Sequence, residues 1–140
     1  MYRVRIVEKE LSFLLTGVFY KIQKARGRFC KEKQYCDDFE NVLKSLSLSY
    51  IREQDIQKFS SEAQEGNRPD FIVNKRLTVD FKAKPYITKD DYNQMQRYLR
   101  SANLELGLIV NMRNYNLRPK RVLNSSFRPG LDNSDNVSDH

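Results

Sequence analysis

Two aspartates and a lysine lie close together in the segment RPDFIVNKRLTVDFKAK, residues 68–84. Asp70 begins one apolar run, and Asp80 and Lys82, separated by one residue, lie in the next. Carboxylate oxygens are the ligands that hard divalent cations prefer. A lysine beside them could hold and activate a water molecule, or stabilise negative charge that develops on a phosphate. These three residues are therefore the candidate catalytic group of the chain.

A predicted β-hairpin brings the three residues together. Residues 70–73 and 77–84 read as strands because they are rich in Val, Ile, Phe and Thr with period-two alternation. Their apolar residues share one face only if an odd number of residues joins the strands, and the three-residue loop 74–76 satisfies this condition. Asp70 then lies opposite Asp80 on the other face, at a cross-strand Cβ distance of about 4.5–5.5 Å. Lys82 projects from that same face about one pleat further along.

Two carboxylates at this distance repel each other, and one takes up a proton unless a cation neutralises the pair. Mg²⁺ commonly binds through one or two carboxylates together with substrate phosphates. The hairpin therefore favours an Mg²⁺ or Mn²⁺ site. By spacing alone, the pattern also fits a solvated sheet face with an Asp80–Lys82 ion pair and Asp70 capping a turn, since an Asp-x-Lys triplet often occurs by chance.

Histidine and cysteine chemistry is largely excluded. The one histidine is the final residue, His140, so a Ser-His-Asp triad, a Cys-His pair, an HExxH zinc site and a histidine general base all lack a positioned imidazole. Cys30 and Cys36 are too few for a disulfide framework or a four-ligand zinc site. They read as reduced thiols of a cytoplasmic protein.

Composition indicates a single basic domain. The chain has 140 residues and a formal net charge of +7, which favours nucleic acid as partner, although an indifferent cationic surface has the same charge. Neither a secretory signal nor a membrane-spanning apolar run is expected, so no membrane partner is predicted. The oligomeric state stays open, a homodimer included.

The predicted elements form a mixed α/β layout with helices packed on a central sheet. Thr88 is a good N-cap for the third helix, with acids following it in the first turn. Residues 1–123 are expected to form one domain, and residues 124–140, polar and without periodicity, a disordered tail. The expected order is helix 8–26, helix 31–46, strand 50–59, loop 60–67, strands 70–73 and 77–84, helix 89–102, strand 104–110 and one further strand at 118–123.

The helical stripes are predicted from apolar spacing. Leu11, Leu14, Leu15, Val18, Phe19 and Ile22 form the buried stripe of the first helix. Tyr35, Phe39, Val42, Leu43 and Leu46 form that of the second, and Tyr92, Met95, Leu99 and Ala102 that of the third.

The hairpin resembles the PD-(D/E)XK nuclease superfamily, which carries a Pro-Asp pair on one strand and an acid-x-Lys triplet on the next. Over nearly the whole length to about Leu123, the chain is similar to the small GxxExxY subfamily. Glu32 and Tyr35 in KEKQY match the Glu-x-x-Tyr step, and Gln94 with Tyr98 matches a Gln-x-x-x-Tyr-Leu helix. Phe29 stands where the motif has its first glycine, with Gly27 two residues earlier.

This resemblance implies a restriction-endonuclease-like core and hydrolysis of phosphodiester bonds in DNA or RNA. Asp70, Asp80 and Glu32 would bind metal, Lys82 would position or activate water, and Gln94 would orient substrate or a ligand, with Tyr35 and Tyr98 in support. Asp80 replaces the usual glutamate, which is one methylene longer. Separately, Glu32 could be a first-turn acid, Tyr35 a core residue and Gln94 a solvated one.

Two other functions remain open. A fold can persist without its chemistry, so the chain could be an inactive nucleic-acid-binding module. It could also be an interaction protein whose partner covers an exposed apolar patch.

Overall fold

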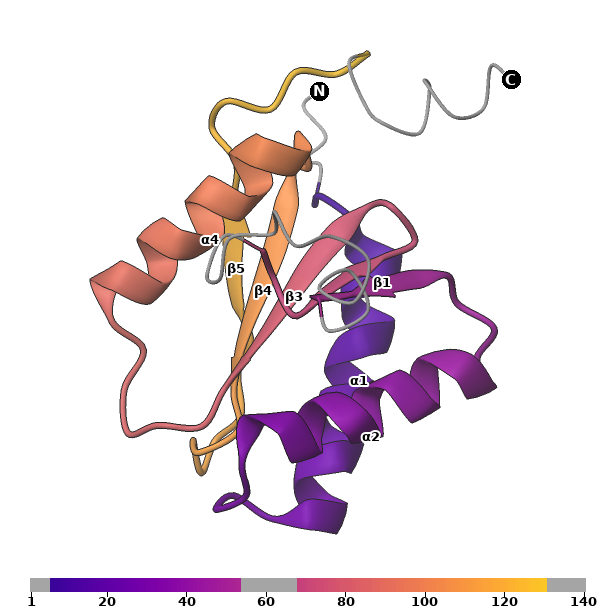
Figure 1. The fold of residues 1–140 in the computed structure, drawn as a ribbon, viewed down its shortest axis with the longest axis vertical. Coiled ribbons are helices and arrows are strands. Elements are labelled where there is room, and N and C mark those ends of the chain that lie inside the picture. Colours follow the sequence, from indigo (N-terminus) through magenta and orange to yellow (C-terminus); the bar gives the residue numbers. More distant parts are fainter. Residues whose placement is uncertain (1–5, 54–67, 131–140) are drawn as a thin grey trace, which may run out of the picture.

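The fold is a five-stranded sheet with helices on both faces (Figure 1). A computed structural model describes residues 6–53 and 68–130, and the counts below refer to these ranges. They contain three helices, α1 Lys9–Arg26, α2 Glu32–Ser45 and α4 Lys89–Ala102. The strands are β1 Tyr50–Arg52, β2 Phe71–Val73, β3 Leu77–Lys82, β4 Leu106–Asn111 and β5 Lys120–Leu123.

The sheet is mixed, with strand order β1-β2-β3-β4-β5. β3 pairs antiparallel with β2 and parallel with β4, while the β1–β2 and β4–β5 pairs are antiparallel. The parallel pair needs a crossover connection, and α4 provides it between β3 and β4. The result is the restriction-endonuclease-like α/β architecture that the sequence predicted.

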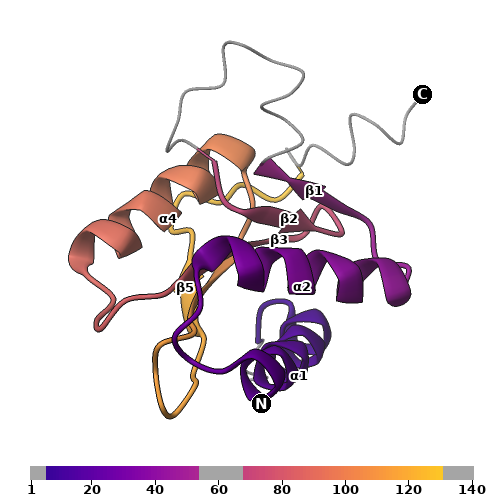
Figure 2. The same ribbon diagram turned by 60° about the horizontal axis from the view of Figure 1, so that its bottom comes forward.

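Each face of the sheet has its own apolar core. α1 and α2 lie together against one face, and α4 lies against the other (Figure 2). On the first face, Phe39 makes edge contacts with Phe71 and Phe81, at ring-centroid distances of 4.9 and 5.2 Å. On the second, Met95 and Leu99 of α4 pack with Ile109 and Val122 of the sheet. Successive residues of β3 therefore alternate between an aromatic core and the α4 side.

Helix boundaries follow the local signals closely. Gly27 ends α1 with a positive φ of 90°, a conformation that glycine adopts without the steric cost of a Cβ. Thr88 caps α4 as predicted, because its Oγ1 accepts from the Asp91 N–H and the Asp91 carboxylate accepts from the Thr88 N–H.

Several predicted details were wrong. The strand that begins at Tyr50 ends at Arg52, and its predicted continuation from residue 54, with the loop 60–67, lies outside the described residues. Leu14, Leu46 and Tyr92 are exposed, because each lies at the edge of a helical stripe that its layer does not cover. Tyr98 takes the buried place on α4 instead.

Asn124, the first residue after the predicted domain boundary at Leu123, packs against the domain. Asn124 is buried, and its side-chain amide donates to the carbonyls of Leu99 and Leu104 over 3.2 and 3.0 Å. These bonds tie the end of β5 to the end of α4, which composition alone did not reveal. Residues 131–140 lie outside the described ranges, so disorder there stays a prediction.

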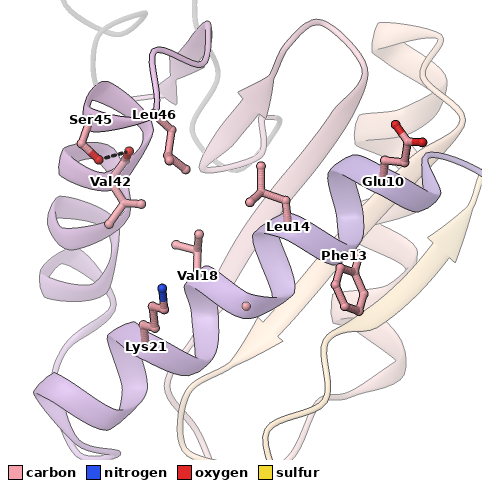
Figure 3. A pocket seen from close by; sticks show the side chains of 9 residues that line it. Glu10, Phe13, Leu14, Val18, Lys21, Val42, Ser45 and Leu46 are labelled. Atoms are coloured by element: carbon pink, nitrogen blue, oxygen red, sulfur yellow. Dashed lines mark hydrogen bonds between the residues drawn. The ribbon is translucent and has the colours of Figure 1, made fainter.

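A shallow groove of about 480 Å³ lies between α1 and the C-terminal end of α2 (Figure 3). Leu14, Val18, Val42 and Leu46 line it with apolar side chains, and Phe13 lies at its rim. It is formed by the two helices alone and lies away from the first turn of α2.

α4 approaches the sheet closely at Gly107. A Cβ on Gly107 would lie 2.7 Å from Thr78 Oγ1 and 2.8 Å from Met95 Cγ. We expect Gly107→Ala to lower the free energy of unfolding by about 1–3 kcal/mol, because overpacking forces these neighbours to shift. Gly17→Ala is the matched control: its Cβ would meet nothing within 4 Å, so alanine should leave stability unchanged or raise it by up to about 1 kcal/mol. Urea unfolding of both variants measures the difference, and equal effects would contradict the packing argument.

Candidate metal and nucleic-acid site

Asp70 and Asp80 lie beside each other at the open end of the β2–β3 hairpin. Phe71 pairs with Val79 and Val73 with Leu77, which confirms the predicted register. The Asp70 N–H donates to Asp80 Oδ1 over 3.1 Å, and the Phe81 N–H donates to Asp70 Oδ2 over 2.7 Å. Each carboxylate thus accepts a hydrogen bond from the main chain of the opposite strand.

This closeness makes the pair electrostatically unfavourable when both groups are charged. Burial raises the pKa of Asp70, the neighbouring Asp80 charge raises it further, and the hydrogen bond from Phe81 only partly opposes them. Two carboxylates held this close favour either a proton on one of them or a cation bound between them, so the pair suits a hard cation.

Lys82 lies against Asp80 and reaches toward α4. Its Nζ is 3.0 Å from Asp80 Oδ2, 3.8 Å from Asp91 Oδ1 and 3.3 Å from the Gln94 Oε1 that accepts its hydrogen bond. Burial lowers the pKa of Lys82, but the charges of Asp80, Asp91 and Glu32 outweigh burial and raise it above its ordinary value. The Lys82 side chain is therefore a charged ammonium group fixed in place by its partners. One of these partners is Gln94, a predicted site residue.

Glu32 faces this cluster from the first turn of α2. Its side chain is exposed, yet the protein around it removes part of its water, which raises its pKa. Lys82 lowers that pKa and Asp80 raises it, so all three groups belong to one electrostatic neighbourhood. The predicted site therefore spans two helices and the hairpin.

Asp91 is a site residue that sequence reasoning missed. Asp91 was read only as a first-turn acid of α4, but its carboxylate also pairs with Lys84 and lies near Lys82. These contacts and the Thr88 hydrogen bonds lower its pKa, although burial acts in the opposite direction. One signal was available in the sequence. Lys82 and Lys84 stand two residues apart around the end of β3, only a few residues before Thr88 caps α4.

Tyr35 and Tyr98 are both buried, and they support different parts of the neighbourhood. The Tyr35 hydroxyl donates to the Gly27 carbonyl over 2.5 Å and accepts from the Cys30 N–H over 3.2 Å, so it fixes the loop before Glu32. Tyr98 lies on the sheet-facing side of α4. Its pKa is raised by burial and then by the charges of Asp80, Glu53 and Asp70.

The residues present fit a metal site made of two carboxylates rather than three. Within 6–53 and 68–130, no group of three or more His, Cys, Asp or Glu side chains could hold a metal ion. The predicted set of Asp70, Asp80 and Glu32 is therefore not such a group. Glu32 is exposed on α2. Two carboxylates still suffice for an ion that keeps several waters and takes further oxygen ligands from phosphates.

The structure thus combines a five-stranded α/β sheet with an acid pair and a lysine on one hairpin. The chain belongs to the PD-(D/E)XK nuclease superfamily, whose family model matches residues 9–122. Members of this superfamily are generally dependent on divalent metal ions, and membership implies interaction with nucleic acid. Comparisons with curated proteins and with solved structures found no match. None of the helices in the described ranges has the length and apolar character of a membrane-spanning segment.

The Asp70 carboxyl gives the metal-free chain a distinct pH dependence. Because its pKa is raised in the folded state, Asp70 loses its stabilising contribution as the pH rises above the ordinary aspartate value of about 4. Asparagine keeps an acceptor for the Phe81 N–H and a donor for Asp80. In EDTA, we therefore expect Asp70→Asn to raise the free energy of unfolding by about 1–3 kcal/mol at alkaline pH and by less at pH 5. Denaturant unfolding across pH measures this, and a difference that shrinks as the pH rises would contradict it.

Proposed function

We propose that this chain is a metal-dependent phosphodiesterase that hydrolyses DNA or RNA with Mg²⁺ or Mn²⁺. The observation that carries the proposal is the opposed Asp70–Asp80 pair with the Lys82 ammonium 3.0 Å from Asp80. Stability alone does not favour such a group, since burying like charges together is unfavourable. The cluster therefore fits a site kept for chemistry.

Asp70 and Asp80 are the proposed ligands of the cation, with Glu32 assisting from α2. A bound divalent cation would supply positive charge to the scissile phosphate and lower the pKa of a coordinated water. Lys82 would then hold the attacking water or stabilise the charge that develops on phosphate oxygen. Gln94 accepts a hydrogen bond from Lys82 and so fixes where that ammonium group points.

We further propose that the chain belongs to the GxxExxY group within the superfamily. Support comes from Glu32, which faces the acid pair, and from Tyr35, which closes the preceding loop. Gly27 provides the left-handed residue of that loop, with φ 90°. A glycine at position 29 is therefore not needed to end α1, which accounts for the departure at Phe29.

Metal binding should stabilise the folded chain through the acid pair. At a metal concentration of about 100 times the dissociation constant, we expect Mg²⁺ or Mn²⁺ to raise the free energy of unfolding by about 2–3 kcal/mol. Asp80→Asn should remove this gain. Asp90→Asn, an exposed first-turn acid of the same charge, should retain it. Urea unfolding in EDTA and in metal at equal ionic strength tests this, and equal stabilisation of both variants would remove the acid pair as the binding site.

Cleavage should depend on Lys82. With labelled single- and double-stranded DNA and RNA in Mg²⁺ or Mn²⁺, we expect Lys82→Ala to lower the cleavage rate by about 10²- to 10³-fold, because a preorganised charge is lost from the site. Lys44→Ala loses the same charge from an exposed position on α2 and should cleave as the wild type does.

Two results would overturn the catalytic proposal. Equal cleavage by both lysine variants would place the activity elsewhere or in a contaminant. Absence of cleavage by the wild type, together with salt-sensitive binding that survives Lys82→Ala, would instead identify an inactive nucleic-acid-binding module.

A further inference from the structure

Two loops lie side by side at one end of the sheet. Glu32, which neighbours the acid pair, is at the same end. One joins α1 to α2 over residues 27–31, and the other joins β4 to β5 over residues 112–119 (Figure 2). Arg28 Nε donates to the Arg113 carbonyl over 2.9 Å and links them directly. Arg113 in turn donates to the Ala83 carbonyl over 3.2 Å, one residue from Lys82.

Exposed aromatic rings lie beside half-buried arginines on these loops. Phe29 and Tyr115 are 75% and 80% exposed, although both side chains are large and flat. The Arg28 guanidinium lies 5.1 Å from the Phe29 centroid and 5.5 Å from that of Tyr115, and the Arg113 guanidinium lies 5.2 Å from Phe29. We call these four residues the aromatic–arginine platform.

Hydrogen bonds from α1 and β4 hold the chain beneath the platform. The Gln23 amide of α1 donates to the carbonyls of Met112 and Asn114 over 3.0 and 2.7 Å. The Asn111 amide donates to the Lys84 carbonyl over 2.7 Å and so connects the β4–β5 loop with the chain that leaves β3. Exposure of the two rings is therefore a property of hydrogen-bonded loops whose other apolar residues, Met112 and Leu117, are buried.

The charge of the two loops is of one sign. Residues 27–31 and 112–119 contain Arg28, Lys31, Arg113 and Arg118 and no aspartate or glutamate. The exposed large apolar side chains of residues 27–31 and 112–119 are both aromatic. This combination matches a ligand with flat rings and negative charge more closely than an aliphatic protein surface.

We propose that the aromatic–arginine platform binds single-stranded nucleic acid, with unpaired bases stacking on Phe29 and Tyr115 and the backbone phosphates near Arg28 and Arg113. The assignment rests on the proposed function and specifies its substrate class. Bases within a duplex are already stacked on each other, so only an unpaired strand can place them on these rings. The hydrogen bond from Arg113 to the Ala83 carbonyl connects the platform with the residue that follows Lys82.

Binding is best measured without turnover, by fluorescence anisotropy of a labelled oligothymidylate with the full chain in EDTA. We expect the double variant Phe29→Ala, Tyr115→Ala to weaken binding by about tenfold or more, since each base–aromatic stack accounts for about 5- to 100-fold in affinity. Tyr115→Phe, which keeps the ring, should bind as the wild type does. Phe13→Ala is the matched control, because Phe13 is 81% exposed on α1 and remote from both loops.

A labelled duplex of the same length completes the test, and its weaker binding should be unchanged by the double variant. Wild-type affinity in the double variant, or an equal loss in Phe13→Ala or with the duplex, would overturn the stacking assignment. Lys82-dependent cleavage with unaltered oligothymidylate binding would reject the platform and leave the proposed function intact. Lost binding in the double variant, with no cleavage by the wild type, would support the platform and reject the phosphodiesterase.

Discussion

The crossed hydrogen bonds between Asp70 and Asp80 are the constraint on which the site depends. Each carboxylate accepts from main-chain N–H of the opposite strand, so neither can move away without leaving a donor unpaired. The same bonds hold two like charges together, which raises the pKa of Asp70. Lys82 neutralises part of that charge from one pleat away. The geometry of the hairpin therefore also sets the electrostatics of the site.

Alternation along β3 connects this constraint with the core. Val79 and Phe81 lie in the apolar layer beneath α1 and α2, and Asp80 and Lys82 point to the side that α4 covers. α4 covers these charged groups and adds a further one, Asp91. The Asp91 carboxylate both caps the helix with Thr88 and pairs with Lys84. The helix start that fixes the crossover therefore also fixes the charges around the lysine.

Local signals were enough wherever neighbouring residues determine the geometry. The hairpin register follows from the requirement for one apolar face, and the start of α4 follows from the Thr88 cap. Patterns failed where another layer decides exposure. Leu14 and Leu46 read as core by spacing, but the helix pair leaves them at an open groove, while Asn124 read as tail and is buried beneath the end of α4.

The sequence by itself determined the opposed aspartates, the lysine one pleat further, the absence of a usable histidine and the class of fold, because these depend on periodicity, turn length and composition. The resemblance implied that Glu32 joins the acid pair, and tertiary structure alone decided that Asp91 lies beside Lys82 and Lys84 and that Phe29 and Tyr115 lie on adjacent loops. Such contacts join residues far apart in the chain. Their existence depends on how layers pack and crossovers run, which no local pattern encodes.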